Sequence, residues 1–187
     1  MSLTLSWDLL VIVFFAIVVT YSFIIGKHES VKIIIATYIA IVAALGLGNL
    51  LERLSSDSAP IFQMVGLTMD LSVLSTTKLI LFIATIIFLA IRGGFDIEYS
   101  RDNGTLIDTL STGVFGFVTA GLMLTTLLTF AADAPLLDKG LSSREPLLGI
   151  MQNSELMRII IENQDVWFAL PAIILIGFGF FNTENEQ

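Results

Sequence analysis

The 187-residue chain contains no cysteine and a single histidine, and it has few charges. Without cysteine it cannot form a disulfide, a thiolate metal site, an iron–sulfur cluster or a cysteine nucleophile. With His28 as its only histidine, one chain cannot build a metal site that uses two histidine ligands, and a Ser-His-Asp triad would depend on a residue in a short charged segment. We therefore expect no catalytic residue, no metal and no cofactor.

Charge is the second scarcity. Charged residues make up 14% of the chain, against about 25% in a typical soluble domain. Hydrophobic residues make up 55%, and the mean hydropathy is +0.88. These few charged residues cannot form the polar surface of a soluble domain. The composition therefore predicts an integral membrane protein whose main partner is the lipid bilayer. The net charge of −8 argues against nucleic acid as a partner and against a polybasic lipid site.

The apolar residues fall into five segments, and a bilayer core requires about 20 apolar residues per helix. We expect spans at about 5–25, 33–51, 71–91, 106–132 and 166–181. The last is short and contains Pro171, so a re-entrant segment is the alternative to a fifth span. The predicted fold class is all-α, a polytopic transmembrane helix bundle of four to five spans in a single membrane domain, 1–187.

The segments between these spans are short or polar. We expect Gly26–Lys32 to be a turn between the first two spans. The long polar segment 133–165 contains a helix start at Asn153-Ser154-Glu155, with Leu156, Ile159 and Ile160 on one face of the helix that follows. This pattern predicts a short amphipathic helix on the membrane surface.

Lysine and arginine give a weak indication of orientation. The two sides of a five-span arrangement carry nearly equal numbers, but those in 26–32 and 92–105 lie in short loops beside the membrane, where the positive-inside rule acts. We expect these two loops to be cytoplasmic, with the N-terminus and 131–165 outside.

Small residues form a stripe on the second span at Ala36, Ala40, Ala44 and Gly48, and stripes of this kind let helix backbones approach closely. A matching set lies on the fourth span. It comprises Thr112, Gly116 and Ala120, with Gly113 and Gly121 beside them. We expect the two stripes to pack against each other. The alternative is that they form a contact between copies of the chain or a pore wall.

Two acids lie near span ends. Asp108 follows Asn103-Gly104-Thr105, so it is expected in the first turn of the fourth span, exposed to water, where the helix dipole favours a negative charge. An acid inside a membrane also suggests an ion or proton path, and threonines such as Thr112 lie nearby. Asp8 has the same two interpretations. As a pair, Asp8 and Asp108 are the two carboxylates that an intramembrane aspartyl enzyme would use.

Several of these features occur in a recognisable order. An acid precedes the first span in Trp7-Asp8-Leu9, and Gly26-Lys27 follows that span as a glycine-plus-basic turn, with Ser30 where a second glycine is common. The fourth span opens with Asp108, Thr112 and Gly116 at intervals of four.

In this order the chain resembles the colicin V production (CvpA-like) family of small bacterial inner-membrane proteins. The family typically has Asp-x3-Gly-x3-Gly at the start of the fourth helix, so Thr112 replaces the first glycine. Ser154-Glu155-Leu156 is similar to a later family segment that begins Ser-x-Leu. The resemblance covers residues 7 to about 160, and the apolar segment 166–181 departs from the family's four-helix pattern.

The resemblance implies a multi-pass protein of the bacterial inner membrane with its N-terminus outside. It also implies a non-enzymatic role in envelope homeostasis or toxin export, through assembly with itself or another membrane protein. The family domain also anchors serine proteases, for which this chain has no room. The alternative function is a small ion or proton channel, or a transporter subunit, with Asp108 lining the path.

Overall fold

The computed structural model describes residues 6–57, 71–92, 105–137 and 145–183, and within these ranges it contains helices and no strands. The all-α prediction is therefore confirmed. The helices are α1 (Trp7–Asp57), α3 (Leu71–Arg92), α4 (Thr105–Ala131), α5 (Glu145–Asn153), α6 (Glu155–Glu162) and α7 (Gln164–Thr183).

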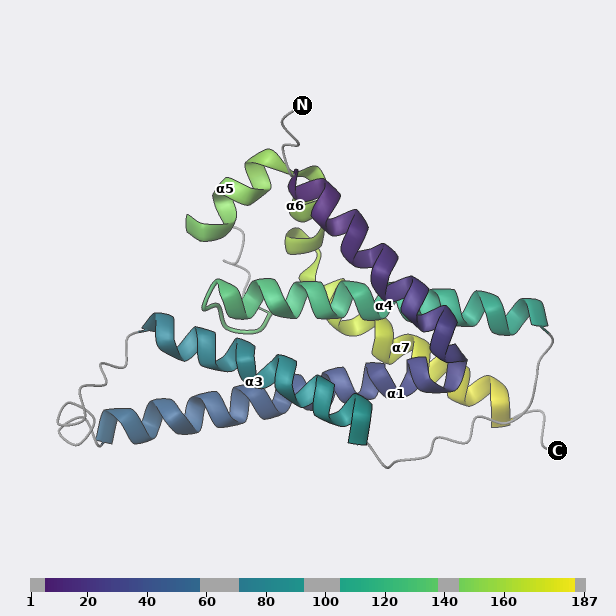
Figure 1. Cartoon of the computed structure of the whole chain (residues 1–187), viewed down its shortest axis with the longest axis horizontal. Helices are drawn as coiled ribbons and strands as arrows, with labels where there is room; N and C mark the ends of the chain where they lie inside the picture. Colours follow the sequence, from purple (N-terminus) through teal and green to yellow (C-terminus); the bar gives the residue numbers. More distant parts are fainter. Residues whose placement is uncertain (1–5, 58–70, 93–104, 138–144, 184–187) are drawn as a thin grey trace.

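Helix α1 has 51 residues and is broken once, at Gly26. A straight helix of this length would measure about 76 Å, far more than a bilayer core of about 30 Å. Gly26 has φ 84° and ψ 177°, a backbone conformation that side chains disfavour. Figure 1 shows the chain turning back at this point. We call 7–25 the first arm of α1 and 27–57 its second arm.

The break at Gly26 is tighter than the sequence predicted. The expected turn over Gly26–Lys32 is wrong, because the helix resumes at Lys27. One glycine in the left-handed region is enough to change the chain direction. The Ser30 hydroxyl stabilises the break: it lies 2.8 Å from the carbonyl oxygen of Gly26 and 3.4 Å from that of Ser22, two carbonyls at the interrupted turns.

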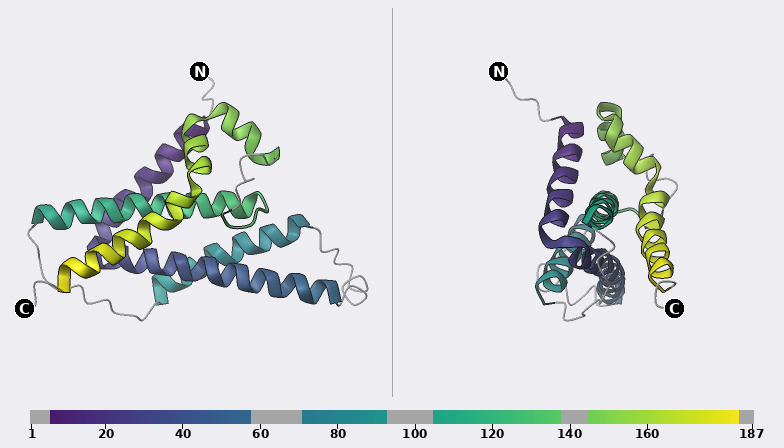
Figure 2. Two further views of the ribbon diagram at one scale, coloured as in Figure 1. Left: turned by 180° about the vertical axis from the view of Figure 1, so that it is seen from behind. Right: turned by 90° about the vertical axis from the view of Figure 1, so that its right-hand side faces the viewer.

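Helix α4 is the centre of the bundle. Viewed nearly end-on, it lies between the first arm of α1 and α7 (Figure 2). Phe115 and Val118 of α4 pack against Val31 and Ile34 of the second arm. Further along α4, Leu122 and Phe130 form a second cluster with residues of the second arm and α3, which are Ala40, Ala44 and Phe82.

The small residues are buried as expected, but they do not meet in the expected pairs. Ala36, Ala40, Ala44 and Ala120 are all at most 2% exposed. The nearest neighbours of Gly116, however, are Ser22 and Val19 of the first arm, and Gly113 faces Phe23. Gly48 faces the side chain of Lys78 on α3. The predicted stripe contact is therefore wrong at Gly116 and Gly48: Gly113 and Gly116 admit the first arm. Ala40 and Ala44 do pack against α4, but against its large side chains Leu122 and Phe130.

Helix α6 forms where the sequence predicted an amphipathic helix, but with a different buried face. Met157, Ile160 and Ile161 are buried, whereas Ile159 is 44% exposed and Leu156 is only partly buried. The reason is that α6 packs against Val11 of the first arm and Leu124 of α4, which selects the face. Helix α7 follows after a bend of 67° and contains Pro171.

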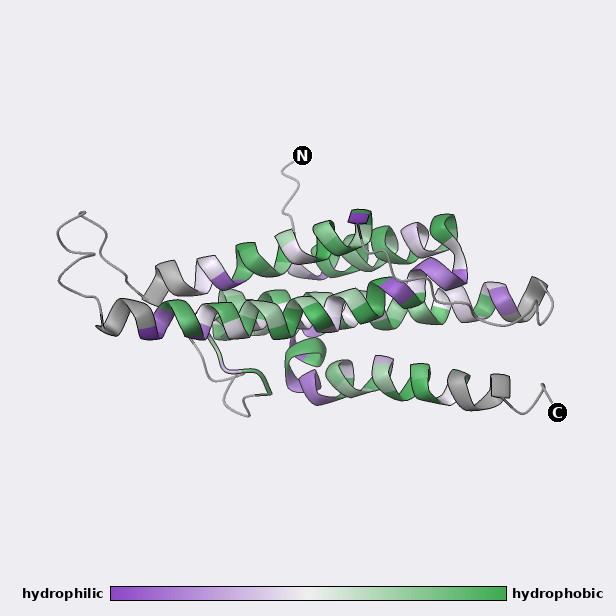
Figure 3. Ribbon diagram, turned by 90° about the horizontal axis from the view of Figure 1, so that it is seen from below, coloured by the Kyte–Doolittle hydropathy of each residue, from purple (hydrophilic) through white to green (hydrophobic). Residues whose placement is uncertain are grey.

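Three helices are long and apolar enough to cross a membrane, judged by length and composition: Trp7–Arg53, Ser75–Arg92 and Asp108–Ala131. The bent pair of α6 and α7 passes the same test only when its helices are taken together, as a broken span or a re-entrant loop. The expected count of four to five spans is thus not confirmed. Hydrophobic residues predominate along the helices (Figure 3), and many large ones are exposed. The most exposed are Ile24, Val42, Leu110 and Ile91.

Close packing at Gly116 predicts a large effect of a side chain there. A Cβ at Gly116 would lie 2.8 Å from the Ser22 Cβ and 3.1 Å from the Val19 Cα. The Val19 Cα is a backbone atom, so it cannot move aside as a side chain can. We expect Gly116→Leu to lower the free energy of unfolding by about 1–3 kcal/mol, as overpacking does. The measurement is thermal unfolding in detergent.

Gly46→Leu is the matched control, because a Cβ at Gly46 meets no atom within 4 Å. It should leave stability unchanged or raise it slightly, since leucine favours a helix more than glycine does. Equal destabilisation by the two substitutions would contradict the close contact between α4 and the first arm.

Candidate functional site

Two polar contacts hold the ends of the first arm. We call the contact between Lys27 and Asp108 the kink pair, and the contact of Asp8 with the start of α6 the α6 cap. Asp8 and Lys27 are 19 positions apart in the sequence, which corresponds to about 28 Å along a helix. That distance is close to the thickness of a bilayer core. The two contacts therefore lie one membrane thickness apart.

The kink pair is an ion pair between Lys27 Nζ and Asp108 Oδ1 at 3.2 Å. The Lys27 side chain is only 8% exposed and that of Asp108 is 27% exposed. The ammonium also lies 5.8 Å from the centroid of the Phe178 ring of α7, within range of a cation–π attraction. A buried ammonium requires such partners, because an uncompensated buried charge is strongly unfavourable.

The position of each partner follows from local structure. Gly26 sets the direction in which the second arm starts, and Lys27 is the first residue after it. Asp108 lies in the first turn of α4, as the sequence predicted. Its carboxylate is partly exposed, but it does more than cap its own helix, because it also pairs with Lys27. The ion pair thus joins the break in α1 to the beginning of α4.

Four threonines of α4 bond to their own helix backbone and do not extend the kink pair. Thr112 donates its hydroxyl to the carbonyl oxygen of Asp108 at 2.8 Å, which is the backbone and not the carboxylate. Three further threonines also donate to the carbonyl four residues before them: Thr119, Thr126 and Thr129. These hydroxyl protons are directed into the helix that carries them.

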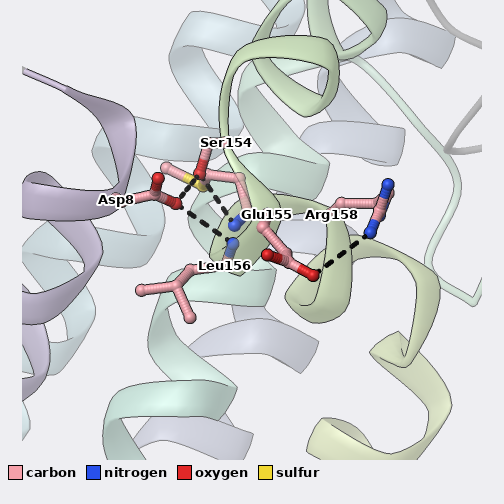
Figure 4. Close-up of polar contacts among 6 residues, drawn as sticks. Asp8, Ser154, Glu155, Leu156 and Arg158 are labelled. Carbon is pink, nitrogen blue, oxygen red and sulfur yellow. Dashed lines mark hydrogen bonds and ion pairs between the residues drawn. The ribbon is translucent and has the colours of Figure 1, made fainter.

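The α6 cap joins the beginning of the first arm to α6 (Figure 4). Asp8 Oδ1 accepts hydrogen bonds from the Ser154 hydroxyl at 2.6 Å and from the Leu156 amide at 3.1 Å. The Ser154 hydroxyl oxygen accepts from the Met157 amide at 3.0 Å, as an N-cap residue does. Asp8 was expected to be a solvated acid at the start of its own helix. Instead it is half-buried and caps a different helix.

The sequence-predicted residues thus separate into groups. Gly26, Lys27, Asp108 and Thr112 gather at the kink pair. Asp8 lies at the other end of the first arm, so Asp8 and Asp108 do not form a dyad. Gly116 is a packing residue. The described residues contain no group of three or more metal-binding side chains.

A third polar contact between helices involves a tyrosine that the sequence did not single out. The Tyr38 hydroxyl of the second arm donates to the carbonyl oxygen of Phe168 in α7 at 2.6 Å. Tyrosines near span ends are commonly interfacial anchors, so nothing in the sequence singled out this one. Pro171, three residues after Phe168, is the nearest signal of an irregular α7 backbone.

Comparisons of the chain with family models, with curated proteins and with solved structures found no match.

Because Lys27 is more buried than Asp108, removing one partner of the kink pair should cost more stability than removing the other. Asp108→Asn leaves a buried ammonium without its counter-charge, so we expect a loss of about 1–3 kcal/mol in the free energy of unfolding. Lys27→Met keeps most of the stem and leaves a carboxylate that water can reach, so its effect should be smaller. The double variant should lose less than the sum of the two single losses.

Chemical or thermal unfolding in detergent measures this cycle. Lys32→Met is the control, because Lys32 pairs with the half-exposed Glu29 and such pairs contribute at most about 1 kcal/mol. Strictly additive losses from Lys27→Met and Asp108→Asn would show that the two residues are not coupled.

Proposed function

We propose that the chain is a multi-pass protein of the bacterial inner membrane that works without catalysis, through assembly with itself or another membrane protein. The resemblance to the CvpA-like family suggests that this work belongs to envelope homeostasis or toxin export. The observation that carries the proposal is the use of Asp8 and Asp108, each of which has an internal partner. An acid committed to a helix contact is a structural element, whereas an acid that relays ions must face a path.

The proposal treats the two arms of α1 as separate membrane crossings. With α3 and α4 this gives four, and the bent pair of α6 and α7 is the fifth, partial or complete. The exposed apolar side chains on the outer faces of α1, α3 and α4 support contact with lipid. The spacing of the kink pair and the α6 cap supports an interface at each end of the first arm.

The orientation belongs to the same proposal. The kink pair lies on the cytoplasmic side, beside Lys32, and the α6 cap lies outside together with the N-terminus. The density of lysine and arginine in the segments 26–32 and 92–105 supports this orientation. Because Asp108 neutralises the charge of Lys27, the other lysine and arginine residues of these segments determine the orientation in the membrane.

The rival function, a channel or transporter subunit, makes the opposite prediction about flux. We expect liposomes that contain the protein to show no ion or proton flux above empty liposomes, and Asp108→Asn to leave this result unchanged. Fluorescent ion and pH indicators measure both. Reproducible flux that disappears with Asp108→Asn would establish the channel function instead.

The same preparations test assembly. Cross-linking in native membranes should give a species heavier than the 20.4 kDa chain, either a multiple of it or a complex with another membrane protein. A chain that remains monomeric and without a partner at every cross-linker concentration would contradict the assembly half of the proposal.

A further inference from the structure

An apolar groove of about 520 Å³ runs along one face of α4, between the first arm of α1 and α7. Figure 2 shows α4 nearly end-on between these two helices. Side chains of α4 at the spacing of one helix face form the floor of the groove, and the other two helices form its walls. The floor residues are Leu110, Val114 and Phe117, and the wall residues are Phe23, Leu170 and Ile174.

Aromatic rings close the groove at one end. The next residue after Phe117 on this face of α4 is Gly121, and the ring of Trp167 lies directly against it, where a Cβ would overlap the ring. Trp167 also packs against Phe15 and Phe117, with ring centroids 5.9 and 5.6 Å away. The other end of the groove lies beside the first turn of α4, which carries Asp108 of the kink pair. The groove therefore extends from the level of the kink pair to the aromatic rings.

The lining of the groove is apolar. Among the residues that the structure describes, Thr109 is the only polar residue that lines it. The floor is accessible from outside the bundle, because Leu110 is 72% exposed and Phe117 is 48% exposed. A polar molecule would lose its hydrogen bonds to water here without replacing them. The occupant must therefore be apolar, either a hydrocarbon chain or a helix of another protein chain.

Length and volume favour the hydrocarbon chain. The eleven positions from Leu110 to Gly121 correspond to about 16 Å along a helix, and half of a bilayer core is about 15 Å. Because a helix is about 10–12 Å wide, 16 Å of it fills at least about 1,200 Å³, more than twice the volume of the groove. A partner helix that crossed the whole membrane would also meet the aromatic rings halfway. An acyl chain of one leaflet ends at that depth.

We propose that this groove holds one acyl chain of a phospholipid from the membrane leaflet on the kink-pair side. The chain lies over Val114, and its terminal methyl group contacts Trp167. Binding is driven by van der Waals contacts with the groove, since a chain that leaves the surrounding lipid was already shielded from water. This inference rests on the proposed function, which places the kink pair at one membrane interface.

Trp167 is the reporter for the test, because bromine atoms on an acyl chain quench tryptophan fluorescence at short range. Trp7→Phe leaves Trp167 as the single tryptophan of the full-length protein. This variant is titrated in detergent with phosphatidylcholine that is brominated either near the terminal methyl group or near the headgroup. We expect the first probe to quench Trp167 and to saturate near one lipid per protein chain, and the second to quench less. Quenching that never saturates, or that is equal for the two probes, overturns the proposal.

A substitution in the floor locates the binding in the groove. Val114→Phe adds a ring where the acyl chain lies, so it should remove the saturable quenching. Val42→Phe is the matched control, because it makes the same change at a 70% exposed position outside the groove, and it should leave the quenching unchanged. Thermal unfolding shows whether each variant is folded. Saturable quenching that persists in folded Val114→Phe overturns the assignment to this groove.

A second copy of the chain is the rival occupant. The chain has no cysteine, so Leu110→Cys introduces a single thiol at the groove, and under oxidation this variant should give no more disulfide-linked dimer than Val42→Cys. Dimers that form with Leu110→Cys but not with Val42→Cys assign the groove to a second copy and overturn the proposal.

Trp7 separates a failure of this inference from a failure of the proposed function. It is 40% exposed at the start of the first arm, and Trp167→Phe leaves it as the single tryptophan. In liposomes, quenching of Trp7 by headgroup-brominated lipid shows that the first arm lies in the membrane. Quenching of Trp7 without saturable quenching of Trp167 overturns the groove assignment alone, and the absence of both overturns the membrane placement as well.

Discussion

Gly26 adopts a positive φ within α1 and breaks the helix there. The rest of the bundle depends on the turn that results. Because the helix resumes at once, the two arms leave the break in fixed directions. Helix α4 then packs against both: Gly113 and Gly116 admit the first arm, and its large side chains contact the second. Lys27 follows the break and ties it to α4 through Asp108. A single backbone conformation thus determines where three helical segments meet.

Several polar side chains in this bundle act on helix ends and breaks. Ser30 stabilises the carbonyls at the Gly26 break, Asp8 and Ser154 cap α6, and Tyr38 contacts the α7 backbone before Pro171. A membrane interior offers no water to such groups, so each irregular point of the backbone needs a partner from the protein.

Long apolar runs located the two arms of α1 and helices α3, α4 and α7, whereas α5 has no such run and was not predicted. The sequence also identified Asp8, Gly26, Lys27 and Asp108, since charges and glycines are rare enough beside apolar runs to be conspicuous. It could not predict that Asp8 caps α6 or that Asp108 pairs with Lys27, because both contacts join segments far apart in the chain. The buried face of α6 was wrong for the same reason. Periodicity favoured Leu156 and Ile159, whereas packing on Val11 and Leu124 buries Met157, and packing on Leu147 buries Ile161.

The turn of α1 at Gly26 is the central claim, and a distance across it is the most direct test. The chain has no cysteine, so spin labels on Val13→Cys and Leu47→Cys, both at exposed positions, report one distance in lipid nanodiscs. Arms that fold back should give less than about 40 Å, the value for arms meeting at a right angle. A distance near 51 Å, roughly that of an unbroken helix, would contradict the account.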